Sequence, residues 1–275
     1  MHMDLMTQVP GADGSAITKA KRGANAWRGN AVGIVIAGIT LLAIWELISL
    51  WRPLFVASPY DSVRLFIQWA IDGTLWVNTW VTVQETLIGA GLSLAIGIPV
   101  GVVLALVRPV DRATRPYIDI MNTIPRLGLA PLFVLWFGLG MQAKIALAFT
   151  SLVFLVVINT YAGIKAVDPE HVLLVRLLGG GRRDVIQRVY VPSLVPWFIV
   201  TLRLCAAFGV ASAVIGEFIA GNMGLGYLLN YNTQVLNTVG EFAALLALIL
   251  LAAVFTIAIM IYERRALRWR RLSEQ

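Results

Sequence analysis

The sequence predicts an all-α polytopic membrane protein with six transmembrane helices. Three observations support this fold class: 59% of the 275 residues are hydrophobic, 13% are charged, and the mean hydropathy is +0.79. A soluble domain carries about 45–50% apolar and about 25% charged residues. A water-soluble globule of this composition would expose a large apolar surface and associate. The same numbers exclude a disordered chain.

Six apolar stretches are long enough to cross about 30 Å of hydrocarbon. Their approximate ranges are 31–51, 81–107, 116–139, 143–164, 194–220 and 241–262, which predicts a membrane domain over 31–263. Residues 1–30 are polar, small and basic, and we expect them to form a disordered cytoplasmic tail. A signal peptide is the alternative interpretation of the first stretch. Its 21 residues exceed the length of a signal h-region, which favours a retained helix.

The distribution of basic residues predicts the orientation of the chain. If both termini lie inside, 17 of the 22 lysines and arginines fall in cytoplasmic segments, and three (Arg52, Arg64, Lys144) fall in outer segments. Cytoplasmic loops carry such an excess of basic residues. We therefore expect cytoplasmic termini, with the basic C-terminal tail 264–275 near anionic lipid headgroups. Nucleic-acid binding is not expected, because the basic residues lie between apolar spans.

Catalytic and metal-binding residues are not expected in this chain. Its one cysteine, Cys205, excludes a disulfide framework, and His2 and His171 are its two histidines. An intramembrane enzyme is an alternative class. It would need a constellation that the spans lack, since Ser93 has no membrane histidine to act with it.

Two segments between the spans are too polar to cross the membrane. Within 53–80, apolar residues recur at helical spacing, which predicts a helix on or near the membrane surface. These residues are Val63, Phe66, Ile67, Ala70 and Ile71.

The second polar segment, 165–193, predicts two short cytoplasmic helices. Asp168 is a candidate N-cap with Pro169 at the first helical position. Three glycines at 179–181 end this helix, and a second helix from Arg182 is expected to end at Pro192. Helices in compact bundles are usually joined by a few residues. The segment is therefore either an amphipathic lid over the bundle or a docking element for a cytoplasmic partner.

Several motifs in order resemble bacterial ABC-importer permeases of the nitrate/sulfonate/taurine branch. The fourth and fifth spans with the loop between them contain Asn159-Thr160-Tyr161-Ala162-Gly163, Leu177-Leu178-Gly179 and Val189-Tyr190-Val191-Pro192-Ser193. Residues 124–140 are similar to the third span of that branch. Gly216-Glu217-Phe218 followed by Gly224-Leu225-Gly226-Tyr227 is similar to its later spans. The resemblance covers about residues 58–270.

The resemblance implies a type I ABC importer permease fold and a role as the membrane subunit of an ATP-driven importer. It implies a partner ATPase subunit, an external solute-binding protein and a permease homodimer in the lipid bilayer of a bacterial inner membrane. The chain has no Gly-x-x-x-x-Gly-Lys phosphate loop. We therefore expect no cofactor on this chain, with ATP and Mg²⁺ bound by the partner ATPase.

The resemblance also implies that the cytoplasmic segment couples the permease to its ATPase. The candidate coupling residues are Asp168, Glu170, Arg176, Gly179, Arg182, Arg183 and Pro192. Where the family places Glu-Ala-Ala, this chain has Leu173-Leu174-Val175. Glu170 or Arg176 could substitute for the missing glutamate.

Candidate residues for the solute path lie in the third and fifth spans. Prolines and a glycine break the third span, and broken helices are a recurring way to build a solute path. These candidates are Pro125, Arg126, Gly128, Pro131 and Glu217.

Charged residues inside the spans leave alternatives open. Arg126 could bind an anionic solute or form an ion pair. Arg203 could also bind an anionic solute, but an ion pair with Glu85 or Glu217, or snorkelling to the cytoplasmic interface, is the favoured interpretation. Glu217 could contact the binding protein, close a gate or serve packing. A proton- or sodium-coupled transporter that uses Glu46, Glu85 or Glu217 is the alternative function.

Overall fold

The computed structural model describes residues 33, 35–124 and 126–266, and this part of the chain is helical without strands. The chain divides into two units, Met1–Pro59 and Tyr60–Gln275. After the first unit, the helices are α2 (Pro59–Ile71), α3 (Thr74–Leu106), α4 (Arg108–Thr123), the 3-10 turn η1 (Arg126–Leu129), α5 (Ala130–Phe137), α6 (Met141–Lys165), α7 (Pro169–Leu177), α8 (Arg182–Val185), the π-helical turn η2 (Ile186–Tyr190), α9 (Val191–Ala220), α10 (Leu225–Gln234) and α11 (Thr238–Ala266). The all-α membrane fold is thus confirmed.

The first unit contains an apolar helix, Val35–Trp51. Most of its large apolar side chains are exposed within this unit, as expected for a helix surrounded by lipid. The chain then turns back on the helix end, where the Trp45 indole Nε1 donates a hydrogen bond to the Ala57 carbonyl (2.9 Å). Glu46 lies on this helix and is exposed.

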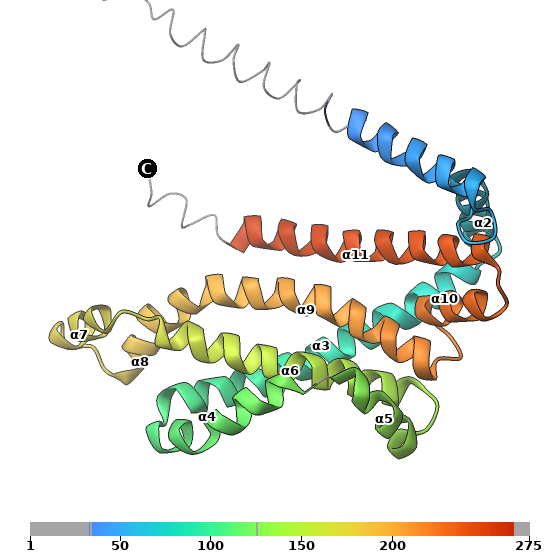
Figure 1. The fold of residues 1–275 in the computed structure, drawn as a ribbon. Helices are drawn as coiled ribbons and strands as arrows, with labels where there is room; N and C mark the ends of the chain where they lie inside the picture. Colours follow the sequence, from blue (N-terminus) through green and yellow to red (C-terminus); the bar gives the residue numbers. More distant parts are fainter. Residues whose placement is uncertain (1–32, 34, 125, 267–275) are drawn as a thin grey trace, which may run out of the picture. The chain divides into compact units, whose positions relative to one another are not determined.

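Four helices of the second unit are long and apolar enough to cross a membrane: Thr74–Leu106, Met141–Lys165, Arg182–Ala220 and Thr238–Arg265. α3, α6 and α9 form the centre of this unit (Figure 1). Glycines bring their backbones close together. A Cβ added to Gly97 or Gly101 of α3 would lie within 2.8 Å of Val156 or Thr160 of α6. Small residues at such crossings drive helix association in membranes.

Two glycines two residues apart, on different sides of α3, provide a matched test of this packing. A Cβ on Gly89 would lie 2.6 Å from the Ala148 Cβ, whereas a Cβ on Gly91 would have no atom within 4 Å. We expect Gly89→Ala to destabilise the protein by about 1–3 kcal/mol, because overpacking forces backbones apart. Gly91→Ala should leave stability unchanged. Thermal unfolding of both variants in detergent checks this, and equal melting temperatures would contradict the packing.

The structure divides the expected third span, 116–139, among three elements. α4 ends at Thr123, η1 covers Arg126–Leu129, and α5 is a helix of eight residues. Pro131 lies at the start of α5, where the missing N–H of a proline has no intrahelical partner to lose. The break expected from the prolines is therefore present, but Pro131 begins a helix instead of interrupting one.

The expected helix end at Pro192 is wrong, because one continuous helix of 39 residues runs from Arg182 to Ala220. The turn before Pro192 is π-helical, with the Val191 N–H donating to the Ile186 carbonyl. A wider turn accommodates the proline, which has no N–H and whose ring crowds the preceding turn. Residues 182–193, from the polar segment, and 194–220, from the expected fifth span, are therefore parts of one helix.

The helix expected within 53–80 is α2. Some of its apolar residues pack against the protein core, and the others are exposed. Phe66 and Ala70, together with Trp69, pack against a core that includes Leu75 and Leu225. Val63, Ile67 and Ile71 are exposed. In the second unit, α7 and α8 lie at one end of the long helices, and α10 lies at the opposite end (Figure 1).

Candidate functional site

The first part of the candidate site is the helical segment α7–α8, which begins with a side-chain cap. The Asp168 carboxylate accepts a hydrogen bond from the Glu170 N–H (2.9 Å), and Pro169 occupies the first turn. Such a cap satisfies a backbone donor that has no intrahelical partner. The local prediction for residues 168–170 is confirmed.

A glycine turn separates α7 from α8. Gly179 has a φ of +82°, a conformation that is costly for residues with a Cβ. The Gly180 N–H donates to the Val175 carbonyl (2.9 Å), and a Cβ on Gly180 would lie 2.6 Å from Val175 Cγ1. Glycine therefore suits both positions of this turn: the backbone conformation favours it at 179, and the lack of space for a Cβ favours it at 180.

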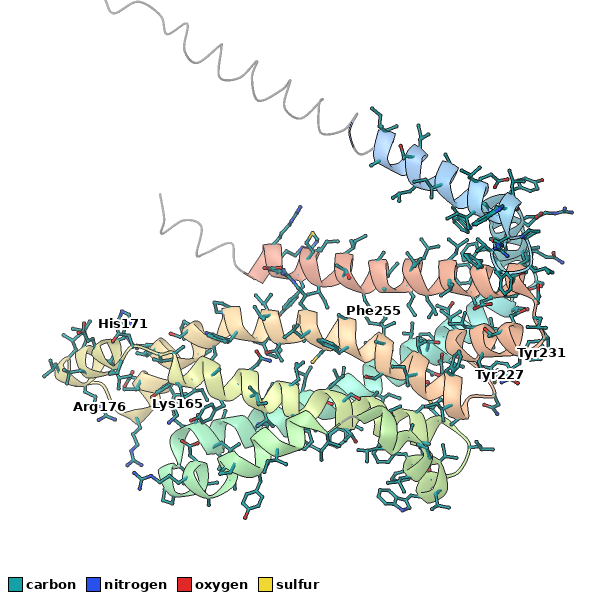
Figure 2. The ribbon with its side chains drawn as sticks, viewed as in Figure 1. Lys165, His171, Arg176, Tyr227, Tyr231 and Phe255 are labelled. Carbon is teal, nitrogen blue, oxygen red and sulfur yellow. The ribbon has the colours of Figure 1, made fainter. Side chains whose placement is uncertain are left out.

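The structure brings the candidate coupling residues together at the α7 end of the bundle. Figure 2 shows His171 and Arg176 projecting there beyond Lys165. The side chains of Asp168, Glu170, Arg176, Arg182 and Arg183 are exposed, as is Gly179, whereas Pro192 is half-buried at the start of α9. A compact, charged and exposed element at one end can contact a partner outside the membrane.

Apolar side chains occupy the position where a Glu-Ala-Ala triplet was expected. Leu173, Leu174, Leu177 and Leu178 have exposed fractions of 57, 54, 75 and 79%. An open groove of about 510 Å³ lies between α7 and the adjoining end of α9, and its wall includes His171, Leu174, Arg188 and Trp197. The α7–α8 segment therefore exposes leucine side chains that are flanked by charged residues.

α4 is attached to the end of α6 that leads into α7. The Tyr161 hydroxyl donates to the Asp111 carboxylate (3.1 Å), and the Lys165 ammonium lies 3.7 Å from the same carboxylate. Lys165 also lies 5.4 Å from the centre of the Tyr161 ring. These contacts hold α4, which forms the first part of the divided third span, against the end of α6 that leads into α7.

Of the third-span candidates for the solute path, the two that the structure describes in full, Gly128 and Pro131, are exposed, whereas Glu217 is buried. No atom lies within 4 Å of a Cβ added to Gly128. Pro125 and the side chain of Arg126 lie outside the described residues. Their role in the solute path stays a prediction.

Glu217 is fully buried and belongs to a polar network at the α10 end. Its Oε1 lies 2.7 Å from the Thr82 hydroxyl, and its Oε2 accepts a hydrogen bond from the Gly226 N–H (2.6 Å). A contact of this side chain with an external protein is excluded in this conformation, because its exposed fraction is 0%. The close approach of Glu217 explains the two glycines of the Gly224-Leu225-Gly226-Tyr227 motif. A Cβ on Gly224 or Gly226 would overlap the carboxylate.

An ion pair completes this network, which we call the α10 network (Asn78, Thr82, Glu85, Lys144 and Glu217). Glu85 of α3 pairs with Lys144 of α6, and their exposed fractions are 0% and 2%. Lys144 Nζ also donates to the Met223 carbonyl (3.2 Å). A Cβ on Gly216 would lie 3.3 Å from Lys144, so a small residue lets α9 approach this side chain.

The α10 network caps the first turn of α10. Gly224, at the N-cap, has no side chain to do so. The Gly224 N–H donates to Asn78 Oδ1 (2.8 Å), and the Leu225 N–H donates to Thr82 Oγ1 (3.0 Å). Backbone donors at a buried helix start require such partners. Side chains of α3 therefore replace the missing cap.

Sequence reasoning missed Lys144 and placed it in an outer segment. It lies in the first turn of α6, inside the protein. A usable signal was present in α3, where Asn78, Thr82 and Glu85 are spaced to share one face of an otherwise apolar helix. A polar stripe of this kind requires buried partners on a neighbouring helix.

The ion pair expected for Arg203 involves a different partner. Arg203 pairs with Glu263 of α11, not with Glu85 or Glu217. Both side chains are partly exposed, as for charges near the end of a span. The pair ties α9 to α11.

Comparisons with known proteins agree with this arrangement. Residues 97–270 match the family described as the binding-protein-dependent transport system inner membrane component. The chain is 31% identical to the formylaminopyrimidine transport permease protein of Halalkalibacterium halodurans, over 85% of this chain and 94% of that protein. It is 27% identical to the taurine transport system permease protein of Escherichia coli, over 83% and 86% of the two chains. The riboflavin transport system permease protein of Chloroflexus aurantiacus is 30% identical, over 87% and 90%.

A solved structure shows the same fold. An inward-facing structure of the MetNI methionine ABC transporter superposes with a TM-score of 0.64 at 19% identity, covering 72% of this chain and 99% of that one. The family match spans more than half of the sequence, and the helical core has the MetI-type arrangement. The chain therefore belongs to the binding-protein-dependent inner-membrane permease family and is the multi-pass permease subunit of an ABC importer.

Proposed function

We propose that two copies of this chain form a path across the bacterial inner membrane for a small polar or anionic organic solute. An external solute-binding protein delivers the solute, and a separate ATPase binds ATP and Mg²⁺ and contacts the α7–α8 segment on the cytoplasmic side. Both termini then lie in the cytoplasm. The distribution of basic residues supports this orientation, since α7 and α8 carry Arg176, Arg182 and Arg183.

The observation that carries this proposal is the continuous helix behind the exposed α7–α8 segment. α8, η2 and α9 form one helix from Arg182 to Ala220. A displacement of α7–α8 by the ATPase therefore acts directly on the far end of α9, where Glu217 holds α10. This geometry can convert ATPase closure into alternating access of the solute path.

Gly179 offers a test of this coupling. Its φ of +82° makes a β-branched residue strained, whereas asparagine tolerates the left-handed conformation. We expect Gly179→Val to reduce ATP-dependent uptake about tenfold or more while ATP hydrolysis by the complex continues. Gly179→Asn should retain coupled uptake. The ratio of solute moved to ATP hydrolysed in proteoliposomes is the measurement, and an unchanged ratio in Gly179→Val would contradict the coupling role.

The solute class is inferred from the names of the relatives. The permeases similar to this chain are named for transport of formylaminopyrimidine, taurine and riboflavin. We propose a solute of this general kind: small, polar and organic. Uptake of these three compounds into proteoliposomes that contain the permease, its ATPase and its binding protein tests the class. If none of the three compounds accumulates in an ATP-dependent way, the solute class inferred from the relatives is contradicted.

A further inference from the structure

The α10 network contains more acidic than basic groups. Glu85 and Glu217 both have an exposed fraction of 0%. Among the described basic side chains, Lys144 alone forms an ion pair with either of them, and its partner is Glu85. Two ionised carboxylates beside one ammonium would leave a net negative charge buried between membrane helices, which is strongly unfavourable. One bound proton would make the network neutral.

The contacts of Thr82 indicate where this proton lies. The Thr82 hydroxyl lies 2.7 Å from Glu217 Oε1 and 3.2 Å from the backbone carbonyl oxygen of Asn78. Both of these oxygens accept hydrogen bonds when Glu217 is ionised, but a hydroxyl has one hydrogen to donate. If Glu217 carries a proton, its O–H donates to Thr82 Oγ1. The Thr82 hydrogen is then available to the Asn78 carbonyl.

The other contacts fit the same assignment. Thr82 Oγ1 accepts from the Leu225 N–H (3.0 Å), so with the Glu217 O–H it accepts two hydrogen bonds and donates one. Glu217 Oε2 accepts from the Gly226 N–H (2.6 Å), as the carbonyl oxygen of a carboxylic acid does. Glu85 faces the Lys144 ammonium, which stabilises its ionised form. The two carboxyl groups thus have different surroundings.

We propose that Glu217 is held as a neutral carboxylic acid and positions α10 in that form. The proton completes a chain of hydrogen bonds from Glu217 through Thr82 to Asn78. This chain ends on the backbone carbonyl of Asn78. The side chains of Glu217, Thr82 and Asn78 accept the N–H groups of Gly226, Leu225 and Gly224, respectively. Glu217 is therefore a positioning residue that fixes the start of α10 to α3 and α9.

Infrared spectroscopy of the full-length permease in complex with its ATPase tests the protonation state directly. At neutral pH we expect the carbonyl-stretch band of a protonated carboxylic acid in the wild-type protein, and its loss in Glu217→Gln. Glu241→Gln, which changes a half-buried glutamate at the start of α11, is the matched control and should retain the band. The absence of such a band from the wild type, or its persistence in Glu217→Gln, would overturn the proposal.

Substitutions provide a second, independent readout. The glutamine amide can donate to Thr82 and accept from Gly226, so Glu217→Gln should keep the melting temperature close to that of wild type. Glu217→Ala, which can do neither, should lose uptake at least tenfold. Glu85→Gln should lower the melting temperature more than Glu217→Gln, because Lys144 loses its carboxylate. The reverse order would place the proton on Glu85 and overturn the assignment. The infrared band does not depend on ATP-driven transport, so it separates this inference from the proposed function.

Discussion

Replacing Lys144 by methionine is expected to destabilise the permease by about 3–5 kcal/mol, because it leaves the buried Glu85 carboxylate without its ammonium partner. The variant also removes the donor to the Met223 carbonyl and so loosens the turn before α10. We expect a large fall in both the melting temperature and the amount of folded protein recovered from membranes. Fluorescence-detected size exclusion over a temperature series measures both.

The double variant Lys144→Met with Glu85→Gln is the control for this prediction. It removes both charges of the pair at similar side-chain volume, so it should recover a large part of the lost stability. Substitution of Arg203 and Glu263, the partly exposed pair, should cost about 1 kcal/mol or less. Equal losses from the buried and the exposed pair would contradict the burial of Lys144.

Gly224→Ala is expected to have the second-largest effect. The new Cβ would overlap the Glu217 carboxylate, and the φ of +117° at this position disfavours any residue with a Cβ. Backbone strain costs about 1–2 kcal/mol, and overpacking adds about 1–3 kcal/mol. We expect loss of uptake together with a lower melting temperature.

Gly138→Ala separates the two causes. Gly138 also has a positive φ, +76°, but no atom lies within 4 Å of a Cβ added there. This variant should show the strain alone and be the milder of the two. If Gly138→Ala and Gly224→Ala lowered the melting temperature equally, the close approach of Glu217 to Gly224 would be contradicted.

Local sequence signals predicted several elements of the fold and the site. The apolar composition predicted the all-α membrane class, and Asp168 with Pro169 predicted the start of α7, because a cap depends on residues that are adjacent in sequence. The glycines at 179–181 predicted the turn after it for the same reason. The prolines around residue 128 predicted a break in the third span, although not its division into α4, η1 and α5.

Features that depend on tertiary contacts were not predictable in this way. Lys144 reads as a loop residue at the edge of an apolar run, and only the approach of α3 supplies Glu85. The cap of α10 comes from Asn78 and Thr82, more than 140 residues away in sequence (|i−j| of 146 and 143). Pro192 reads as a helix end, but the π-helical turn before it allows the helix to continue.

Purification of this chain with its native partners tests whether a separate ATPase drives the permease subunit. The tagged chain, extracted in mild detergent from its own membrane, should bring an approximately equimolar protein with a Gly-x-x-x-x-Gly-Lys phosphate loop. In liposomes, the purified complex should move solute only with ATP and should be insensitive to a protonophore. A chain that purifies alone, and whose uptake needs no ATP and collapses with the protonophore, would contradict ATP-driven transport and favour coupling to an ion gradient.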